Sequence, residues 1–196
     1  MTGTEVRGDP GAPHAERLAA SSSARLRLRI EPFVAQTGLR VAPRSPGATR
    51  VAEALGVALP DAGSVAAGSE RRILWLGPDE WLVLGPPNSE AATLRALATA
   101  LGPEGAAVDV TSNRVAVEVA GADARDVLAT CCNLDLHPRA FGPGRCAGTL
   151  LGTAQVVLEQ TADEPAFVLL VRPSFLAYVI DWLVAGTRSV RAARSG

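Results

Sequence analysis

The sequence predicts an α+β fold in which antiparallel, ferredoxin-like sheet units carry their helices on one side. Segments with strand periodicity alternate with segments of helical periodicity, in the order strand, helix, and then three rounds of two strands plus a helix. The two strands of a round are separated by only a few residues in most cases, which favours antiparallel pairs. The repetition is therefore one of structural units, without a fixed sequence period.

The first half of the chain supplies a strand, a helix, a hairpin and a second helix. Residues 25–30 alternate arginine with apolar residues, which is typical of a strand with one face in water. The further elements expected here are an extended segment at 39–41, a helix at 47–55 capped by Gly56, strands at 73–76 and 81–84, and a helix at 87–101. Gly77-Pro78-Asp79-Glu80 joins the hairpin, because proline presets φ in such a turn and Asp79 suits its second central position.

The second half repeats this order around one long loop. The expected elements are strands at 106–111 and 114–120, a helix at 121–130, a loop at 131–147, strands at 149–158 and 167–171, and a helix from Pro173 that Gly186 ends. Helical spacing predicts a buried face on the last helix, made by Phe175, Tyr178, Val179, Trp182 and Leu183.

The ends of the chain predict the domain organisation. Residues 1–25 are rich in Gly, Pro, Ser and charge, so we expect a disordered tail there. We expect a single domain at 26–187 and a flexible tail at 188–196. The N-terminal residues contain no apolar segment of signal-peptide type, and no apolar run is long enough for a membrane span. Together with an odd number of cysteines, this predicts a cytoplasmic protein.

Charge and composition exclude several kinds of chemistry. The formal net charge is −1, so the chain has no general field that attracts nucleic acid or acidic membranes. All 19 basic residues are arginine. A Schiff-base lysine, a phosphate-loop lysine and a lysine general base are therefore excluded.

Two patterns in the 131–147 loop imitate cofactor and metal sites. Gly142-Pro143-Gly144-Arg145-Cys146-Ala147 matches G-x-G-x-x-A, but it does not link a buried strand to a helix, so we interpret it as a tight turn. Cys131, Cys132, His137 and Cys146 include no C-x-x-C pair, and adjacent cysteines point in divergent directions. Cys131 also falls on the buried stripe of its helix, the usual place for a free thiol. We expect neither a cofactor nor a metal ion here.

His137 is the one histidine of the expected domain, and Asp135 is placed to orient its ring as in an acid–base pair. No Ser or Cys is set up as the nucleophile that such a base would serve. We therefore favour a hydrogen bond that fixes the loop.

The remaining candidates also have structural interpretations. Asp79 suits the turn, Glu80 follows it, and Asp109 is expected to point outward from its strand. Trp75 and Trp81 flank the hairpin turn and are interpreted as core or interface anchors, because no basic groove accompanies them. The sequence thus predicts no catalytic, cofactor-binding or metal-binding residue on this chain.

Five blocks of the sequence resemble the gamma subunits of bacterial heterotetrameric sarcosine oxidases. They are Gln36 with Leu39-Arg40, Leu76–Leu82, Val108–Arg114, Leu134–Phe141 continuing into Gly144–Thr149, and Arg172–Phe175 with Asp181–Leu183. Leu134-Asp-Leu-His-Pro138 is the most specific of these. A weaker resemblance, in the turn Val119–Ala124, is to the folate-binding domain of the glycine-cleavage T-protein, and it implies a fold of that type.

The resemblance implies a role within a larger enzyme. Such complexes oxidise N-methylglycine to glycine and, with oxygen, yield hydrogen peroxide, while the methyl carbon leaves as formaldehyde or passes to tetrahydrofolate. The resemblance places FAD, FMN, NAD and tetrahydrofolate on the alpha and beta subunits and zinc on the delta subunit. It implies a non-catalytic assembly role for the gamma subunit and leaves open whether His137 or the 131–147 loop does more.

Two other functions remain open at this stage. One is a stand-alone folate-binding or aminomethyltransferase-like protein, and the other is a scaffolding domain unrelated to sarcosine. If the chain is a subunit, we expect the aromatic hairpin and the 131–147 loop to expose an apolar patch, which would make the isolated chain poorly soluble.

Overall fold

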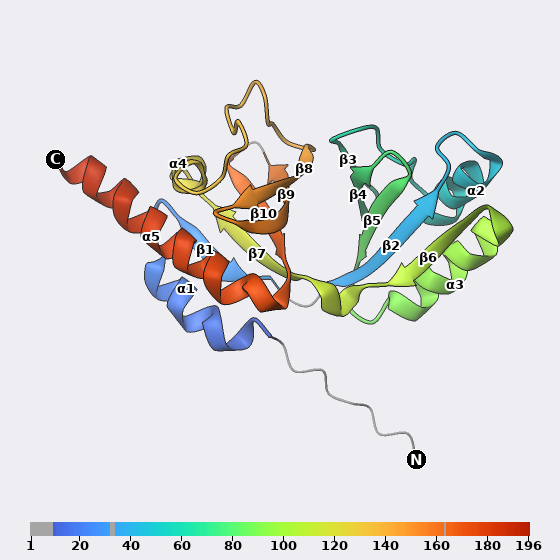
Figure 1. The fold of residues 1–196 in the computed structure, drawn as a ribbon, viewed down its shortest axis with the longest axis horizontal. Coiled ribbons are helices and arrows are strands. Elements are labelled where there is room, and N and C mark those ends of the chain that lie inside the picture. Colours follow the sequence, from blue (N-terminus) through green and yellow to red (C-terminus); the bar gives the residue numbers. More distant parts are fainter. Residues whose placement is uncertain (1–9, 32–33, 163) are drawn as a thin grey trace, which may run out of the picture.

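Two five-stranded antiparallel sheets face each other and carry helices on their outer faces (Figure 1). The computed structural model describes residues 10–31, 34–162 and 164–196. Sheet I has the order β1 (Arg27–Ile30), β7 (Val115–Ala120), β10 (Ala166–Val171), β9 (Ala154–Ala162), β8 (Cys146–Leu151). Sheet II has the order β3 (Val65–Ala67), β4 (Arg72–Gly77), β5 (Glu80–Gly85), β2 (Ala35–Val41), β6 (Gly105–Asp109).

Each sheet has its own set of helices. Those on sheet I are α1 (Ala15–Ser21), α4 (Ala124–Ala129) and α5 (Leu176–Ser195), and those on sheet II are α2 (Pro46–Leu55) and α3 (Glu90–Leu101). Short 3-10 turns are η1 (Ala12–His14), η2 (Gly102–Glu104), η3 (Thr111–Asn113) and η4 (Pro173–Phe175). Among the described residues, no helix is both long and apolar enough to cross a membrane.

The two sheets are built on one plan, which confirms the predicted ferredoxin-like units with helices on one side. In sheet II the chain runs β2, α2, β3, β4, β5, α3, β6. In sheet I it runs β7, α4, β8, β9, β10, α5, and the last place, equivalent to β6, is taken by β1 from the start of the chain. The N-terminal strand therefore completes the C-terminal unit.

Three apolar clusters follow from the alternation of side chains along the strands. One lies between sheet I and its helices and includes Leu18, Val117, Phe167 and Leu183. A second lies between sheet II and its helices and includes Leu39, Ile73, Trp81 and Leu97. The third joins the facing sheets and consists of Leu74, Leu82, Leu84, Ala116, Cys146, Val157, Val168 and Leu170.

Polar contacts also link the sheets. Arg72 on β4 forms an ion pair with Glu159 on β9, with 3.2 Å between Nε and Oε1. At the β3 and β8 edges the Val65 N–H donates to the Gly144 carbonyl at 2.8 Å, and the Cys146 N–H donates to the Gly63 carbonyl at 3.1 Å. The two sheets are thus joined by backbone hydrogen bonds along one edge.

The predicted tails are wrong for the described residues. Residues 12–21 form η1 and α1, and Leu18 is fully buried against sheet I. At the other end α5 continues to Ser195, with Val190 buried and Arg194 paired to Asp123 at 3.1 Å. Both segments are ordered because each buries an apolar side chain. The part of the predicted tail at residues 1–9 lies outside the described residues.

The last helix also differs from its prediction. Gly186 does not end α5, because it lies where the helix crosses α4; a Cβ at this position would come within 2.5 Å of the Thr130 hydroxyl and 3.1 Å of the Val127 carbonyl. The buried face is rotated from the predicted one and consists of Leu176, Val179, Ile180, Leu183, Val184, Gly186, Thr187 and Val190. Phe175 and Trp182, which were predicted to be buried, are exposed.

Three strand predictions are corrected as well. The segment predicted as one strand at 149–158 is two strands, because Gly152 at φ +58° makes a turn between β8 and β9. Strand β2 starts at Ala35 instead of residue 39. Its polar residues Gln36 and Thr37 are buried, and the Gln36 side-chain amide donates to the Arg114 carbonyl at 2.7 Å. The short strand β3 was not predicted.

Candidate functional site

The loop from Cys131 to Ala147 is held in shape by one arginine that the sequence did not single out. Arg125 on α4 donates to the carbonyls of Leu136 and Phe141 and, at 2.8 Å, to the side chain of Gln160. Its guanidinium also lies 5.1 Å from the centre of the Phe167 ring. Burial lowers the pKa of Arg125, but the group stays charged, since an arginine pKa is far above neutrality.

The apolar side chains of this loop point inward. Leu136 and Phe141 are buried in the sheet I core, and the chain then turns through Gly142 to Arg145 and pairs with sheet II at Ser64. Gly144 has φ +73°, which favours glycine. The glycine motif is therefore the tight turn that was predicted, and it leads into strand β8.

The structure gives Asp135 and His137 a role in fixing the loop. The Asp135 carboxylate accepts from the His137 backbone N–H at 2.9 Å, and His137 Nδ1 accepts from the Arg139 N–H at 3.2 Å. Asp135 thus binds the backbone of His137. These are the local bonds of an Asx-type turn.

The cysteines are buried in separate environments. Cys131 belongs to the sheet I core, as predicted, whereas Cys146 lies between the sheets, where its thiol donates to the carbonyls of Ser64 and Trp75. Burial raises the pKa of both thiols to about 11, so they are protonated at neutral pH. Within the described ranges, no group of three or more His, Cys, Asp or Glu side chains is placed to hold a metal ion.

The carboxylates and tryptophans near the hairpin have structural partners. Asp79 and Glu80 both pair with Arg40, at 3.4 and 2.7 Å, and the Asp109 carboxylate accepts from the Thr111 N–H at 2.9 Å. The Trp81 ring is buried in the sheet II core and donates to the Pro60 carbonyl at 3.1 Å.

The predicted exposed apolar patch is therefore wrongly placed. Trp81 is buried, Trp75 is half-buried, and the apolar residues of the 131–147 loop point into the core. The large hydrophobic side chains that the structure exposes are Val108, Leu150, Phe175 and Trp182.

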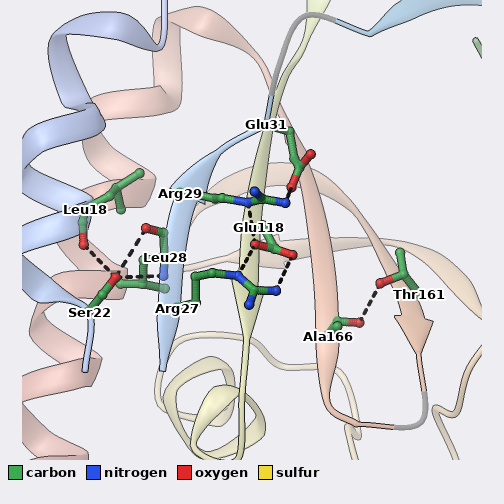
Figure 2. Close-up of polar contacts among 9 residues, drawn as sticks. All are labelled: Leu18, Ser22, Arg27, Leu28, Arg29, Glu31, Glu118, Thr161 and Ala166. Carbon is green, nitrogen blue, oxygen red and sulfur yellow. Dashed lines mark hydrogen bonds and ion pairs between the residues drawn. The ribbon is translucent and has the colours of Figure 1, made fainter. Parts of the chain in front are cut away.

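The space between the sheets opens at its two ends into cavities that are lined by both charged and apolar residues. A cavity of about 560 Å³ at one end is lined by Arg29, Glu31, Arg72 and Glu118, among others. Glu118 on β7 accepts two hydrogen bonds from Arg27, at 2.7 and 2.9 Å, and one from Arg29 at 2.7 Å, as Figure 2 shows. Arg29 also pairs with Glu31 at 2.8 Å. The arginines of the alternating N-terminal strand thus belong to an ion-pair network.

This network predicts an acid-dependent loss of stability. The hydrogen bond from Arg27, together with the charges of Arg29 and Arg27, lowers the pKa of Glu118, although its burial opposes the shift. A carboxylate with a lowered folded-state pKa stabilises the fold above its unfolded pKa of about 4.3, and this stabilisation disappears as the pH falls through the folded-state value. Because Arg27 and Arg29 are more than half exposed, we expect Glu118→Gln to remove only about 1 kcal/mol at neutral pH.

Urea unfolding between about pH 3 and pH 7 measures this effect. The difference between wild type and Glu118→Gln should shrink as the pH falls through the acidic range. Burial raises the pKa of Glu159. Because Glu159 is present in both proteins, the contribution of its titration to stability cancels in the comparison. Parallel pH curves would contradict the assignment.

The cavity at the opposite end, of about 610 Å³, contains two arginines. Its wall includes Glu80, Arg114, Leu150, Gln155 and Arg172. Burial lowers the pKa of Arg114, and the positive charge of Arg172 lowers it further. Neither arginine was singled out by sequence analysis, because the pairing of β7 with β10 that brings them together was not predicted.

Comparison with known proteins decides the family. The model of the "Sarcosine oxidase, gamma subunit family" matches residues 42–188. The chain belongs to this family. The sarcosine oxidase subunit gamma of Corynebacterium sp. strain P-1 is 40% identical over 185 residues, which cover 92% of this chain and 90% of that protein. The sequence-based identification of a sarcosine oxidase gamma subunit is confirmed.

Solved structures agree with this assignment of the gamma subunit. A chain of the heterotetrameric sarcosine oxidase from Corynebacterium sp. U-96, solved with pyrrole 2-carboxylate, has a TM-score of 0.88 and 37% identity, over 94% of this chain and 96% of that one. The glycine cleavage system aminomethyltransferase T from Bartonella henselae has a TM-score of 0.62 and 14% identity, over 86% of this chain and 48% of that one. The second likeness confirms the predicted T-protein-like fold.

Proposed function

We propose that this chain is the non-catalytic gamma subunit of a heterotetrameric sarcosine oxidase, assembled with alpha, beta and delta subunits. The observation that carries the proposal is the near full-length likeness to a chain of such a heterotetramer. In this role the chain contributes a surface to the assembly, and the oxidative demethylation of sarcosine takes place on other subunits. FAD, FMN, NAD, tetrahydrofolate and zinc belong to those subunits.

The contacts of the polar residues support a structural role. Asp135 and His137 fix the 131–147 loop, Glu118 binds two arginines, and Glu159 pairs with Arg72 across the sheets. These are bonds that shape a rigid surface. Three free cysteines support a cytoplasmic location for the assembly. The shared cluster between the sheets supports a single domain, extended at both ends beyond residues 26–187.

Co-expression with the other sarcosine oxidase subunits of its organism tests the proposal. We expect the chain to co-elute with them in gel filtration, in a complex that consumes oxygen when sarcosine is added. A soluble oxidase of full activity that forms without this chain would contradict a required role.

Calorimetry with tetrahydrofolate on the isolated chain tests the alternative of a stand-alone folate-binding protein. That alternative rests on a likeness at 14% identity, which shows the fold alone. We expect no tight binding, because the proposal places the folate on another subunit. Stoichiometric binding would favour the alternative.

A further inference from the structure

Two arginines lie opposite each other where strands β7 and β10 meet the inter-sheet cavity. The register pairs Val171 with Val115, and the next position along the two antiparallel strands places Arg172 opposite Arg114. Both line the 610 Å³ cavity. Like charges directly opposite on neighbouring strands destabilise a sheet. This pair therefore lowers the stability of the isolated chain.

Among the described residues of this wall, Glu80 is the acid whose charge favours the charged form of Arg114, and Glu80 is shared with Arg40. Neither guanidinium has an ion pair or side-chain hydrogen bond to the part of the chain that the structure describes. Glu80 lies in the same wall, but its carboxylate binds Arg40 at 2.7 Å. Arg114 is half-buried, so little water compensates its charge. The wall thus has two positive charges and one negative charge, a balance that suits one added carboxylate.

An exposed apolar rim borders the same cavity. Leu150 is part of the wall and is 40% exposed. Phe175 is 44% exposed and is the last residue of η4, the 3-10 turn that follows Arg172. The turn after Leu150 lies against the outer side of α5, where the Tyr178 hydroxyl accepts from the Thr153 N–H at 3.1 Å. On the same side Trp182 is 40% exposed and stacks edge-on against Tyr178, with 6.3 Å between ring centres.

We propose that this surface, consisting of Arg114, Arg172, Leu150, Phe175 and Trp182, is a docking site for another subunit, which inserts an aspartate or glutamate side chain between the two arginines. The inference rests on the proposed function. Arginine and large aromatic residues are enriched where subunits meet, and a carboxylate buried between guanidinium groups makes short, charge-assisted hydrogen bonds. The apolar rim favours a protein segment over a small anion, because a small anion would leave Leu150, Phe175 and Trp182 in water.

Charge reversal in the assembled complex tests this surface. Arg172→Glu would place a carboxylate where the partner's carboxylate is expected, and Arg114→Gln removes the half-buried charge. Arg95→Glu is the matched control, because Arg95 is exposed on α3, on the outer side of sheet II. Each variant is co-expressed with the other subunits, purified through a tag on this chain, and assayed for the co-purified subunits.

We expect Arg172→Glu and Arg114→Gln to reduce the bound subunits by about tenfold or more, and Arg95→Glu to bind like wild type. The urea midpoints of the isolated Arg172→Glu and Arg114→Gln chains should equal or exceed the wild-type value, since each change removes a like-charge repulsion. A merely structural role for the arginines would instead lower these midpoints, and that result would overturn the proposal.

Two other results would also overturn it. Equal co-purification of all variants would show that the surface is not an interface. If acetate then raised the melting temperature of wild type but not of Arg114→Gln, the cavity would be a site for a small carboxylate. If wild type itself bound no other subunit, the proposed function would fail, and this surface with it.

Discussion

Leu18→Ala is expected to lower the free energy of unfolding by about 3 kcal/mol, although the sequence suggests a disordered segment there. The Leu18 side chain is fully buried in the sheet I core, between α1 and the strands. Replacing a buried leucine by alanine removes apolar contacts and leaves a cavity, which together cost about 2–5 kcal/mol. Urea unfolding followed by circular dichroism measures the difference.

Arg17→Ala is the control on the same helix. Arg17 forms an ion pair with Asp181 at 2.6 Å, but both side chains are largely exposed. We therefore expect a change within about 0.5 kcal/mol. If Leu18→Ala were equally mild, α1 would not be packed on the sheet in solution.

Arg72→Ala is expected to destabilise the chain by about 2–3 kcal/mol at neutral pH, because it leaves Glu159 buried without its ion-pair partner. Glu159 is 2% exposed, and one of its carboxylate oxygens accepts no hydrogen bond among the described residues. The expected loss lies below that of a fully buried pair, since the Arg72 side chain is 39% exposed.

A double variant and the pH dependence make this test specific. Arg72→Ala with Glu159→Gln should recover most of the lost stability, because no charge then remains buried. Burial already raises the pKa of Glu159, and loss of Arg72 should raise it further. A raised folded-state pKa means that stability grows as the pH falls toward the unfolded value of about 4.3, so Arg72→Ala should approach wild type in mild acid. A loss that is independent of pH would contradict this explanation.

Periodicity in the sequence predicted the helices and strands that contain several large apolar residues, and it missed the helices and strands that contain few such residues. The hairpin at Trp75 and Trp81 and the helix before Gly56 are confirmed, because strong apolar patterns and turn residues mark them. Helix α1 has one large buried residue, Leu18, so no periodic pattern marked it. The start of β2 was missed because Gln36 and Thr37 are polar yet buried, and the Gln36 side chain is bound to the Arg114 carbonyl.

The rotated face of α5 shows where spacing alone is insufficient. Helical spacing predicted a buried face that includes Val179 and Leu183, and both are fully buried in the structure. The rest of the buried face lies to the other side, at Leu176 and Ile180, whereas Phe175 and Trp182 are exposed. The predicted face was therefore partly correct and extended too far toward the aromatic residues. The exposure of these aromatic residues, together with the Arg114–Arg172 pair, required the three-dimensional arrangement.

The place of β1 in sheet I sets the order in which the protein can fold as it leaves the ribosome. All strands of sheet II are contained in residues 35–109, so this half can close while the chain is still growing. Strand β1 is synthesised first, yet its partner β7 follows only after the whole of sheet II, and α1 must wait for α5 at the end of the chain. Closing such distant contacts is slow. The residues of α1 and β1, which are translated before sheet II, are thus among the last to reach their native neighbours.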